Sequence, residues 1–362
     1  MPLCMIVGGQ YGGEGKGLIT AHLASRGDAD VLIKTGGPNS AHSFGTGSSM
    51  FRVRMVPSGA NLGSAAIVFP AGCLIHVQTL LDELAALDYR GRVLVDPNAG
   101  IVDGNTVAAQ RADRFYESVG STLTGTGHAT SRRALRRLTL ARDEPRLAGF
   151  LNDTKLFVWD ALKRGQRVVV EGAQAYGLSN YHGEYPYVSS RDTTAGEFLA
   201  QVGLGPQYLD TVILVIKCFP TRNQGGSGAL SYELAPEFVA SYATVLEEKG
   251  GGSYEKPDRT RRVGLFDCEV VKRACIANTP HAIALTGVDR LRALLHEPIV
   301  SEHYGKTAEA FVRLVEEACQ CEVALIATGP HVTDVVARPQ MGPLFTANPQ
   351  KKRGANGSRA EA

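Results

Sequence analysis

A glycine-rich segment near the N-terminus has the residues expected of a phosphate-binding loop. It spans Gly8–Gly17 (GGQYGGEGKG), between a strand-like run, Leu3–Val7, and a helix-like run, Leu18–Ala24. Glycines let backbone N–H groups turn toward phosphate oxygens, and a helix N-terminus and a lysine add positive charge. The spacing is not the standard one, since Gly17 stands where Ser or Thr would hold magnesium. The alternative is a glycine-rich turn without a ligand.

Polar residues that suit phosphoryl and carboxylate chemistry follow other apolar runs. His42 comes after the run Val31–Lys34, where a histidine can supply a proton or a cation to phosphoryl transfer. Gln174 follows another apolar run, and its amide can hydrogen-bond a ligand. Arginines in the segment 259–262 can bind carboxylates through two parallel hydrogen bonds. The alternatives are a solvated histidine, a polar residue that ends a buried strand, and a surface charge patch.

The elements that must position these residues alternate between short apolar runs and helical patterns. Continuously apolar runs are typical of strands covered on both faces. We expect strands at Leu3–Val7, Val31–Lys34, Ala66–Phe69, Arg92–Val95, Arg167–Val170, Thr211–Ile216, Ala282–Leu285 and Val323–Ile326. Helical spacing is found at Val77–Leu87, Asp153–Lys163, Phe238–Glu248 and Ala308–Cys319. The alternation predicts an α/β fold with a mainly parallel central sheet and helices on both faces.

Composition and charge narrow the class of protein. The formal net charge is +2 with Lys and Arg scattered along the chain, which does not favour nucleic-acid binding. Seven cysteines without a CxxC pair indicate reduced thiols. No run approaches the roughly 18 apolar residues of a membrane span, and the N-terminus leaves no room for a signal peptide. We expect a cytoplasmic protein with one domain over residues 1–345 and a disordered tail over 346–362.

The loop resembles the signature of adenylosuccinate synthetases, in which Gly-Asp-Glu-Gly-Lys-Gly follows an aromatic residue. Those enzymes use GTP to phosphorylate the C6 oxygen of IMP, and aspartate then displaces the phosphate. Further segments resemble the family in the same order. They are Gly36–Ser43, Thr124–Gly127, Glu171–Gln174, His182–Ser190, Arg259–Asp267 and Thr328–Pro330. The resemblance therefore covers most of the chain.

The resemblance implies a role for each matching residue. Catalytic roles fall to His42, Lys16 and Gln174. The acceptor nucleotide would contact Gly13, Asn39, Thr124, Arg136, Gln174, Ser189 and Asn223. Aspartate would bind Arg259 and Arg261, and the donor nucleotide would bind Gly12, Glu14, Gly15, Lys16, Gly17, Asp289, Thr328, Gly329 and Pro330. Magnesium would meet the backbone of Gly13 and Ala41. The donor would be ATP, dATP or GTP, since Asp289 is kept and a family lysine near it is absent.

The family pattern also implies a homodimer. An arginine of the cluster Arg132–Arg137, best matched by Arg136, would reach the phosphate of the substrate bound to the partner subunit. The alternative for this cluster is a solvated helix face.

One departure from the family pattern bears on the substrate. Gly13 stands where the family has an aspartate that acts as general base on the purine N1 and helps to bind magnesium. Loss of the side chain also makes room beside purine C2, where guanine carries an amino group. This resembles phage-encoded enzymes that condense dGMP with aspartate to give N6-succino-2-amino-2′-deoxyadenylate, on the pathway to 2-aminoadenine in viral DNA. The sequence thus favours a dGMP-specific ligase. The alternatives are an ordinary adenylosuccinate synthetase acting on IMP with GTP, and a nucleotide-binding protein without catalysis.

Overall fold

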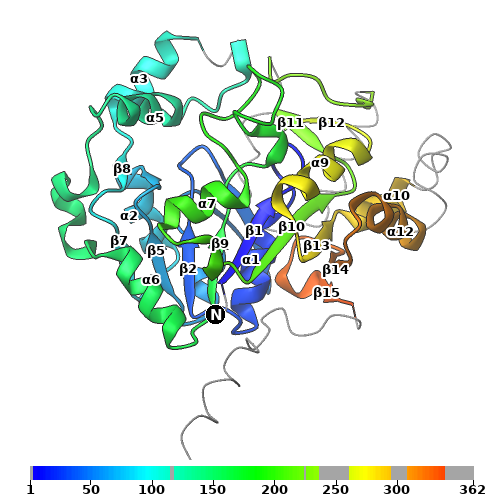
Figure 1. Cartoon of the computed structure of the whole chain (residues 1–362), viewed down its shortest axis with the longest axis horizontal. Coiled ribbons are helices and arrows are strands. Elements are labelled where there is room, and N and C mark those ends of the chain that lie inside the picture. The colour runs from blue at the N-terminus through cyan, green and yellow to red at the C-terminus, as the bar shows by residue number, and fades with distance from the viewer. Residues whose placement is uncertain (1–2, 115–117, 224–225, 236–260, 295–307, 339–362) are drawn as a thin grey trace, which may run out of the picture.

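A nine-stranded sheet forms the centre of the protein in a computed structural model that describes residues 3–114, 118–223, 226–235, 261–294 and 308–338. The strand order is β15-β14-β13-β10-β1-β9-β2-β5-β7, running from right to left in Figure 1. All neighbouring strands pair in parallel except β14 and β15, which are antiparallel. The bounds are β1 Leu3–Gly8, β2 Val31–Lys34, β5 Ala66–Phe69, β7 Val93–Val95, β9 Val168–Glu171, β10 Thr211–Lys217, β13 Ala282–Thr286, β14 Val323–Ala327 and β15 Val335–Ala337.

The eight predicted strands are all confirmed, and each is continuously or almost continuously buried. The ninth strand, β15, was not predicted. It is three residues long, and two of these are exposed. Its three apolar residues form too short a run to distinguish this edge strand from a loop.

Helices cover both faces of the sheet, as predicted. Alternate residues of β1 divide between two cores. Met5 lies in one core with Val158, Phe198 and Phe311 from the helices of one face, and Ile6 lies in the other with Ile19. The helices are α1 Lys16–Ser25, α2 Val77–Ala86, α3 Gly104–Ala112, α5 Thr126–Ala134, α6 Thr154–Lys163, α7 Ala195–Val202, α9 Cys268–Asn278, α10 Val288–Leu294 and α12 Ala308–Cys319. The predicted helices near α2, α6 and α12 are confirmed, whereas Phe238–Glu248 lies outside the described residues.

Smaller elements surround the sheet. Three two-stranded pairs are β3 (His42–Thr46) with β4 (Ser49–Val53), β6 (Leu74–Ile75) with β8 (Gly100–Ile101), and β11 (Thr221–Asn223) with β12 (Arg261–Val263). Short 3-10 helices cover Ala60–Leu62, Ala141–Asp143, Pro145–Phe150, Tyr176–Leu178, Pro206–Tyr208 and Val332–Asp334. The antiparallel β11–β12 pair sets Asn223 opposite Arg261.

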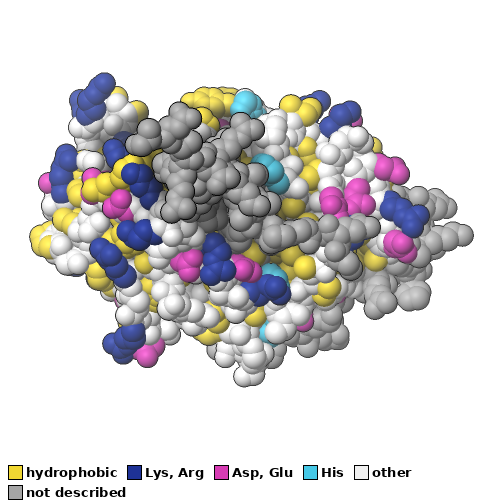
Figure 2. Space-filling view, turned by 60° about the horizontal axis from the view of Figure 1, so that its bottom comes forward, with side chains coloured by type: hydrophobic (Ala, Val, Ile, Leu, Met, Phe, Trp, Pro, Cys, Tyr) yellow, Lys and Arg dark blue, Asp and Glu magenta, His cyan; other side chains and the backbone are white. Residues whose placement is uncertain are grey.

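The surface carries charges of both signs. On the face drawn in Figure 2, Lys and Arg side chains are spread out and Asp and Glu side chains lie among them. No helix in the described parts of the chain is both long enough and apolar enough to span a bilayer. The division into one domain over 1–345 stays a prediction, and the tail over 346–362 lies outside the described residues.

Candidate functional site

The residues singled out by type and spacing gather where parallel strands of the sheet end. The glycine-rich loop follows β1, His42 comes eight residues after the end of β2, and Gln174 comes three residues after β9. Asp289 and Thr328 follow β13 and β14 in the same way. The carboxyl ends of parallel strands meet at one edge of a sheet, which is where open α/β sheets bind their ligands.

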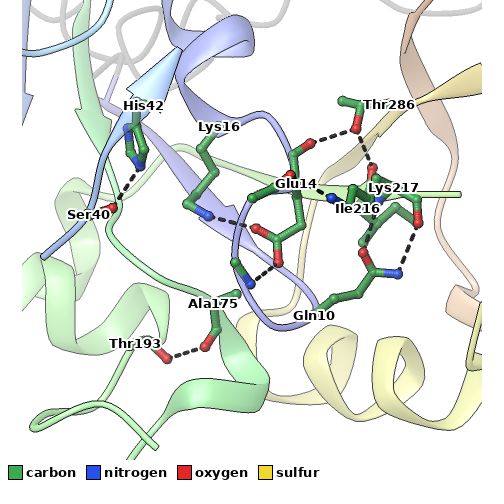
Figure 3. Close-up of polar contacts among 12 residues, drawn as sticks. Gln10, Glu14, Lys16, Ser40, His42, Ala175, Thr193, Ile216, Lys217 and Thr286 are labelled. Carbon is green, nitrogen blue, oxygen red and sulfur yellow. Dashed lines mark hydrogen bonds and ion pairs between the residues drawn. The ribbon is translucent and has the colours of Figure 1, made fainter. Parts of the chain in front are cut away.

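The glycine-rich loop is held closed by its own acidic residue (Figure 3). The two carboxylate oxygens of Glu14 accept hydrogen bonds from the backbone N–H of Gly12, at 2.6 Å, and from the ammonium of Lys16, at 2.8 Å. Glu14 and Lys16 are both buried. The Thr286 hydroxyl donates to the Glu14 carbonyl and so ties the loop to the end of β13. The loop thus places the Lys16 ammonium and the Gly12 N–H around one carboxylate at the start of α1. Phosphate binding by this loop stays a prediction.

Close packing explains why Gly17 is not the Ser or Thr of a standard phosphate loop. A Cβ at Gly17 would lie 2.6 Å from the Cβ of His42 and 2.7 Å from Oγ of Ser58. Real Cβ atoms do not make such contacts, so only glycine fits without a shift of β3. The first turn of α1 therefore packs directly against His42, the residue proposed for catalysis.

Cationic and hydroxyl groups occupy the surroundings of Gly13. The Lys217 ammonium donates to the Gly13 carbonyl at 3.1 Å and to the Thr221 hydroxyl at 2.9 Å. Arg261 donates to the same hydroxyl at 3.4 Å. Burial lowers the pKa of Lys217 well below its usual range, and Arg261 and Arg290 add to the shift. A side chain at Gly13 would enter a cluster of positive charge.

This arrangement does not by itself fit a magnesium ion at Gly13. The carbonyl that would coordinate the ion already accepts a hydrogen bond from an ammonium group, and glycine offers no carboxylate. Throughout the described ranges, no three His, Cys, Asp or Glu side chains are placed to share a metal ion. Ala41, the other backbone position that the resemblance implies, lies next to His42 and is partly buried.

His42 belongs to a buried network of four side chains. Its Nδ1 lies 2.7 Å from Oε1 of Glu171, and its Nε2 lies 3.0 Å from the Ser40 hydroxyl. The Lys34 ammonium lies 2.8 Å from Oε2 of Glu171. The Lys34 ammonium also lies 3.2 Å from Nδ1. The shorter contact is with the carboxylate, which only accepts hydrogen bonds when ionised, so we assign the proton of the neutral ring to Nδ1 and the lone pair to Nε2. Figure 3 shows Nε2 facing Ser40, with the Lys16 side chain nearby.

The charges of this network keep Glu171 ionised and His42 neutral. Burial and the Lys34 ammonium lower the pKa of His42 to about 4, although Glu171 opposes the shift. Burial alone would raise the pKa of Glu171, but Lys34 and His42 outweigh it and hold the pKa well below its usual range. At neutral pH the ring therefore offers a lone pair at Nε2 to a bound group.

We expect the free energy of unfolding to fall as the pH is lowered from about 6.5 to about 4. His42 takes up a proton at its ordinary pKa of 6.5 in the unfolded chain but only at about 4 in the folded one. The unfolded state therefore binds more protons in this window, and stability is lost as the pH falls. The loss is roughly 3 kcal/mol. Urea unfolding at several pH values measures it. His42→Phe should flatten the slope, and the exposed His182→Asn should not. An unchanged slope in His42→Phe would contradict the assignment.

Three of the predicted acceptor-binding residues carry buried polar atoms that lack a hydrogen-bond partner among the described residues. They are Asn39 Oδ1, Gln174 Nε2 and Ser189 Oγ. Buried polar groups are normally paired, so these three atoms are available to a ligand or an ordered water. Gln174 also has a φ of +58°, a left-handed conformation that is uncommon for a side chain of this size and is concentrated at functional sites.

The other predicted phosphate contacts lie near α5. The Thr124 hydroxyl lies 3.2 Å from those of Thr122 and Thr126, at the start of this helix. Arg136 is exposed just beyond the end of α5, in a left-handed conformation. An exposed side chain in that position is accessible to solvent and to another subunit.

Of the residues predicted to bind aspartate and the ribose, the structure describes Arg261 and Asn223. Arg259 lies outside the described residues. Arg261 reaches the surroundings of Gly13, whereas Arg262 forms an ion pair with Glu233 at 2.6 Å. Asn223 lies in β11, and its carbonyl accepts a hydrogen bond from Ser227. The described part of the segment therefore brings one arginine, Arg261, to the loop.

The predicted donor-base residues lie at the ends of neighbouring strands. Asp289 is in the first turn of α10, directly after β13. Thr328 follows β14 and bonds to the carbonyl of Asp334 through its N–H and its hydroxyl. The Pro330 carbonyl accepts from Gly45 N–H at 2.9 Å, and a Cβ at Gly329 would clash with Asp334. This segment is thereby fixed against β3, the strand that begins with His42.

Three charged residues of the site were missed by sequence reasoning. Glu171 lies in a segment that resembles the family but received no role, and Lys34 was considered only as the end of an apolar run. Lys217 was not considered, since it follows the predicted strand Thr211–Ile216. Each is the last residue of a buried parallel strand. A charged residue that ends an otherwise apolar run is the signal that would have found them, because such residues are rarely buried without a partner.

The chain resembles known proteins over nearly its full length. A family profile described as Adenylosuccinate synthetase matches residues 5–143 and 138–304. The adenylosuccinate synthetase of Archaeoglobus fulgidus is 36% identical over 344 residues, which cover 93% of this chain and 98% of the relative. That of Methanocaldococcus jannaschii is 36% identical over 337 residues, which cover 92% of this chain and 95% of the relative.

Solved structures share the fold. The fully ligated adenylosuccinate synthetase of Plasmodium falciparum superposes with a TM-score of 0.82 at 20% identity and covers 93% of this chain and 100% of its own. The succinoaminodeoxyadenylate synthetase (PurZ) of cyanophage S-2L, bound to dGMP and to dATP as an energy donor, superposes with a TM-score of 0.77 at 25% identity. It covers 94% of this chain and 96% of its own.

Proposed function

The chain belongs to the adenylosuccinate synthetase family, and on that premise we propose that it joins aspartate to C6 of a 6-oxopurine nucleoside monophosphate. A purine triphosphate would drive the reaction. The observation that carries the proposal is the convergence at one edge of the sheet. A phosphate loop with Lys16, the buried His42 network and the unpaired atoms of Asn39, Gln174 and Ser189 all belong to segments that follow parallel strands.

The first step would transfer the γ-phosphoryl group to the purine C6 oxygen. The bond between this phosphorus and the bridging oxygen breaks, a bond to the C6 oxygen forms, the nucleoside diphosphate leaves, and the N1 proton is lost. Lys16 would neutralise charge on the transferring group. An anionic triphosphate beside Nε2 would favour protonation of His42, which then donates a hydrogen bond to a phosphoryl oxygen. Gln174 would hold the C6 oxygen.

The second step would be attack on C6 by the aspartate amine with loss of phosphate and one proton. Arg259 and Arg261 would orient the aspartate carboxylates. Asn39, Thr124 and Ser189 would bind the 5′-phosphate of the acceptor, and Asn223 its sugar. We further propose a homodimer in which Arg136 reaches the acceptor bound to the partner subunit, since this exposed arginine lies just beyond the end of α5.

The acceptor with the broader support is IMP. The archaeal relatives that align over almost the whole chain are named adenylosuccinate synthetases, and the family acts on IMP. The family also typically uses Mg²⁺ and GTP, which makes GTP the first donor to test. Any magnesium would arrive with the triphosphate oxygens, because the described residues around Gly13 offer it no carboxylate.

A second acceptor, dGMP, is favoured by one specific observation, the glycine at position 13. Glycine has no side-chain atoms, so residue 13 would not clash with an amino group on purine C2. The cyanophage neighbour is bound to dGMP and to dATP, which keeps dATP and ATP as candidate donors. The product would then be N6-succino-2-amino-2′-deoxyadenylate.

A matched assay decides between the acceptors. We expect phosphate release that depends on aspartate, a purine triphosphate and one of the two acceptors, each offered at equal concentration with GTP, ATP or dATP. The succinylated product is identified by mass spectrometry. Higher turnover of IMP would establish the ordinary reaction, and higher turnover of dGMP the phage-type one. No turnover with either acceptor, despite tight nucleotide binding, would refute the proposed ligase and leave a binding protein.

A further inference from the structure

Lys34 is among the largest fully buried side chains of the described residues, and stability alone does not explain it. Taking an ammonium group out of water costs several kcal/mol. Replacing a whole buried ion pair by apolar residues of similar size often costs no stability. A lysine kept in the interior, at the end of a strand that leads to the site, is therefore a candidate for a functional role.

The carboxylate beside Lys34 has its two oxygens assigned to different donors. Lys34 ends β2 and Glu171 ends β9, and the two residues are paired across these neighbouring strands. Oε2 of Glu171 accepts from the Lys34 ammonium at 2.8 Å and from the Ser58 N–H at 3.3 Å. Oε1 lies 2.7 Å from Nδ1 of His42. Two donors on Oε2 fix the plane of the carboxylate and leave Oε1 to the imidazole.

We propose that Lys34 is a positioning residue for phosphoryl transfer, because it holds the Glu171 carboxylate that orients His42. The proposal rests on the function proposed above and adds a residue to it. With the proton assigned to Nδ1, which faces Oε1 of Glu171, Nε2 is turned to the other side, where Ser40 contacts it. A carboxylate that orients an imidazole in this way sustains catalysis without touching the substrate.

Loss of Lys34 should disturb the orientation of His42 more than it disturbs substrate binding. Without the ammonium, Oε2 keeps only the longer bond from Ser58, and the carboxylate is free to rotate. Phosphoryl transfer is sensitive to misplacement of a catalytic group by about 1 Å. The polar partners of Lys34 are His42 and Glu171. They do not include Asn39, Gln174 or Ser189, the residues proposed to bind the acceptor.

The test compares Lys34→Met with wild type and with Lys155→Met, a control at an exposed lysine of α6. We expect Lys34→Met to lower kcat by at least about tenfold, with KM for acceptor and aspartate within about twofold of wild type. In ¹⁵N spectra of histidine-labelled protein, the His42 signals are identified by their absence in His42→Ala. They should report the Nδ1–H tautomer in wild type and a mixture of tautomers in Lys34→Met.

Each outcome bears on the proposal. Wild-type kcat in Lys34→Met overturns it, and so does an unchanged His42 tautomer together with a rise in KM, which would show a structural role. If Lys34→Met does not fold, Lys34→Met/Glu171→Gln removes both charges, and full activity of that variant overturns the proposal. If wild type has no ligase activity, the proposed function fails instead, and the ¹⁵N spectra still test whether Lys34 orients His42.

Discussion

Replacing His42 with alanine should lower kcat of the ligase reaction by about 10²- to 10⁴-fold and leave nucleotide binding largely intact. The side chain is buried beside the loop, and its Nε2 contacts only Ser40 among the partners seen here. A group that acts on the transferring phosphoryl contributes in the transition state, so its loss lowers kcat more than it raises KM. Steady-state kinetics, with nucleotide affinity measured by calorimetry, separate the two effects.

The matched control for this variant is His281→Asn. His281 is an exposed histidine that directly precedes β13, so it lies at the edge of the sheet opposite to the site. We expect wild-type kcat in the control. If His42→Ala keeps its kcat but loses nucleotide affinity, His42 binds substrate in the ground state and the proposed transfer role is wrong.

Replacing Gly13 with aspartate should shift acceptor preference from dGMP toward IMP by about tenfold to a hundredfold, whichever acceptor wild type prefers. A few additional heavy atoms in a packed site cost ~1–3 kcal/mol, which corresponds to that range in affinity. The aspartate could accept hydrogen bonds from N1 and from the 2-amino group of guanine, so shape rather than charge disfavours dGMP. The ratio of kcat/KM for the two acceptors measures the shift.

The local geometry determines how the new side chain settles. A Cβ at residue 13 would collide with the guanidinium of Arg261, a flexible group that can move, and would lie 3.5 Å from Oγ1 of Thr221. The carboxylate would then have Arg261 and Lys217 as counter-charges. The φ of +71° at Gly13 strains any side chain, although aspartate tolerates it better than most. Gly13→Ala is the control for this strain.

The two variants separate backbone strain from the effect of the aspartate side chain. A shift of equal size in Gly13→Ala would assign the effect to backbone strain and the first side-chain carbon, and a shift in Gly13→Asp alone to the rest of the aspartate side chain. An unchanged ratio in both variants would show that acceptor specificity lies elsewhere, and Asn223 in β11 would be examined next.

The strands of the sheet could be predicted because each is a continuous apolar run that can be recognised in the sequence by itself. A continuous apolar run such as Thr211–Ile216 is stable only when both faces are covered, and this requires neighbours on each side. Pairs such as β3–β4 and β11–β12 could not be predicted. Their strands are three to five residues long and mix exposed with buried positions, so periodicity carries little information.

The glycine-rich loop could be predicted because its residues are consecutive in the sequence. Contacts between residues far apart in the sequence could not be predicted. Glycines and a lysine before a helix indicate a phosphate loop by themselves. The partnership of Lys34, Glu171 and His42 depends on the parallel register of β2 and β9, which are separated by more than a hundred residues. Arg261 beside Gly13 depends likewise on the β11–β12 pair. No spacing rule encodes such contacts.

The loop in this structure carries its own counter-ion. The carboxylate of Glu14 takes the hydrogen bonds of Gly12 and Lys16 that a phosphate would take, so nucleotide binding is an exchange of one anion for another. A tethered carboxylate competes at high effective concentration, so free anions with one charge displace it poorly. A triphosphate brings several charges and further contacts to the same exchange. Every phosphate ligand bears the same cost of displacing this carboxylate, so ligands with one phosphate should bind weakly and a triphosphate should overcome the cost through its further contacts.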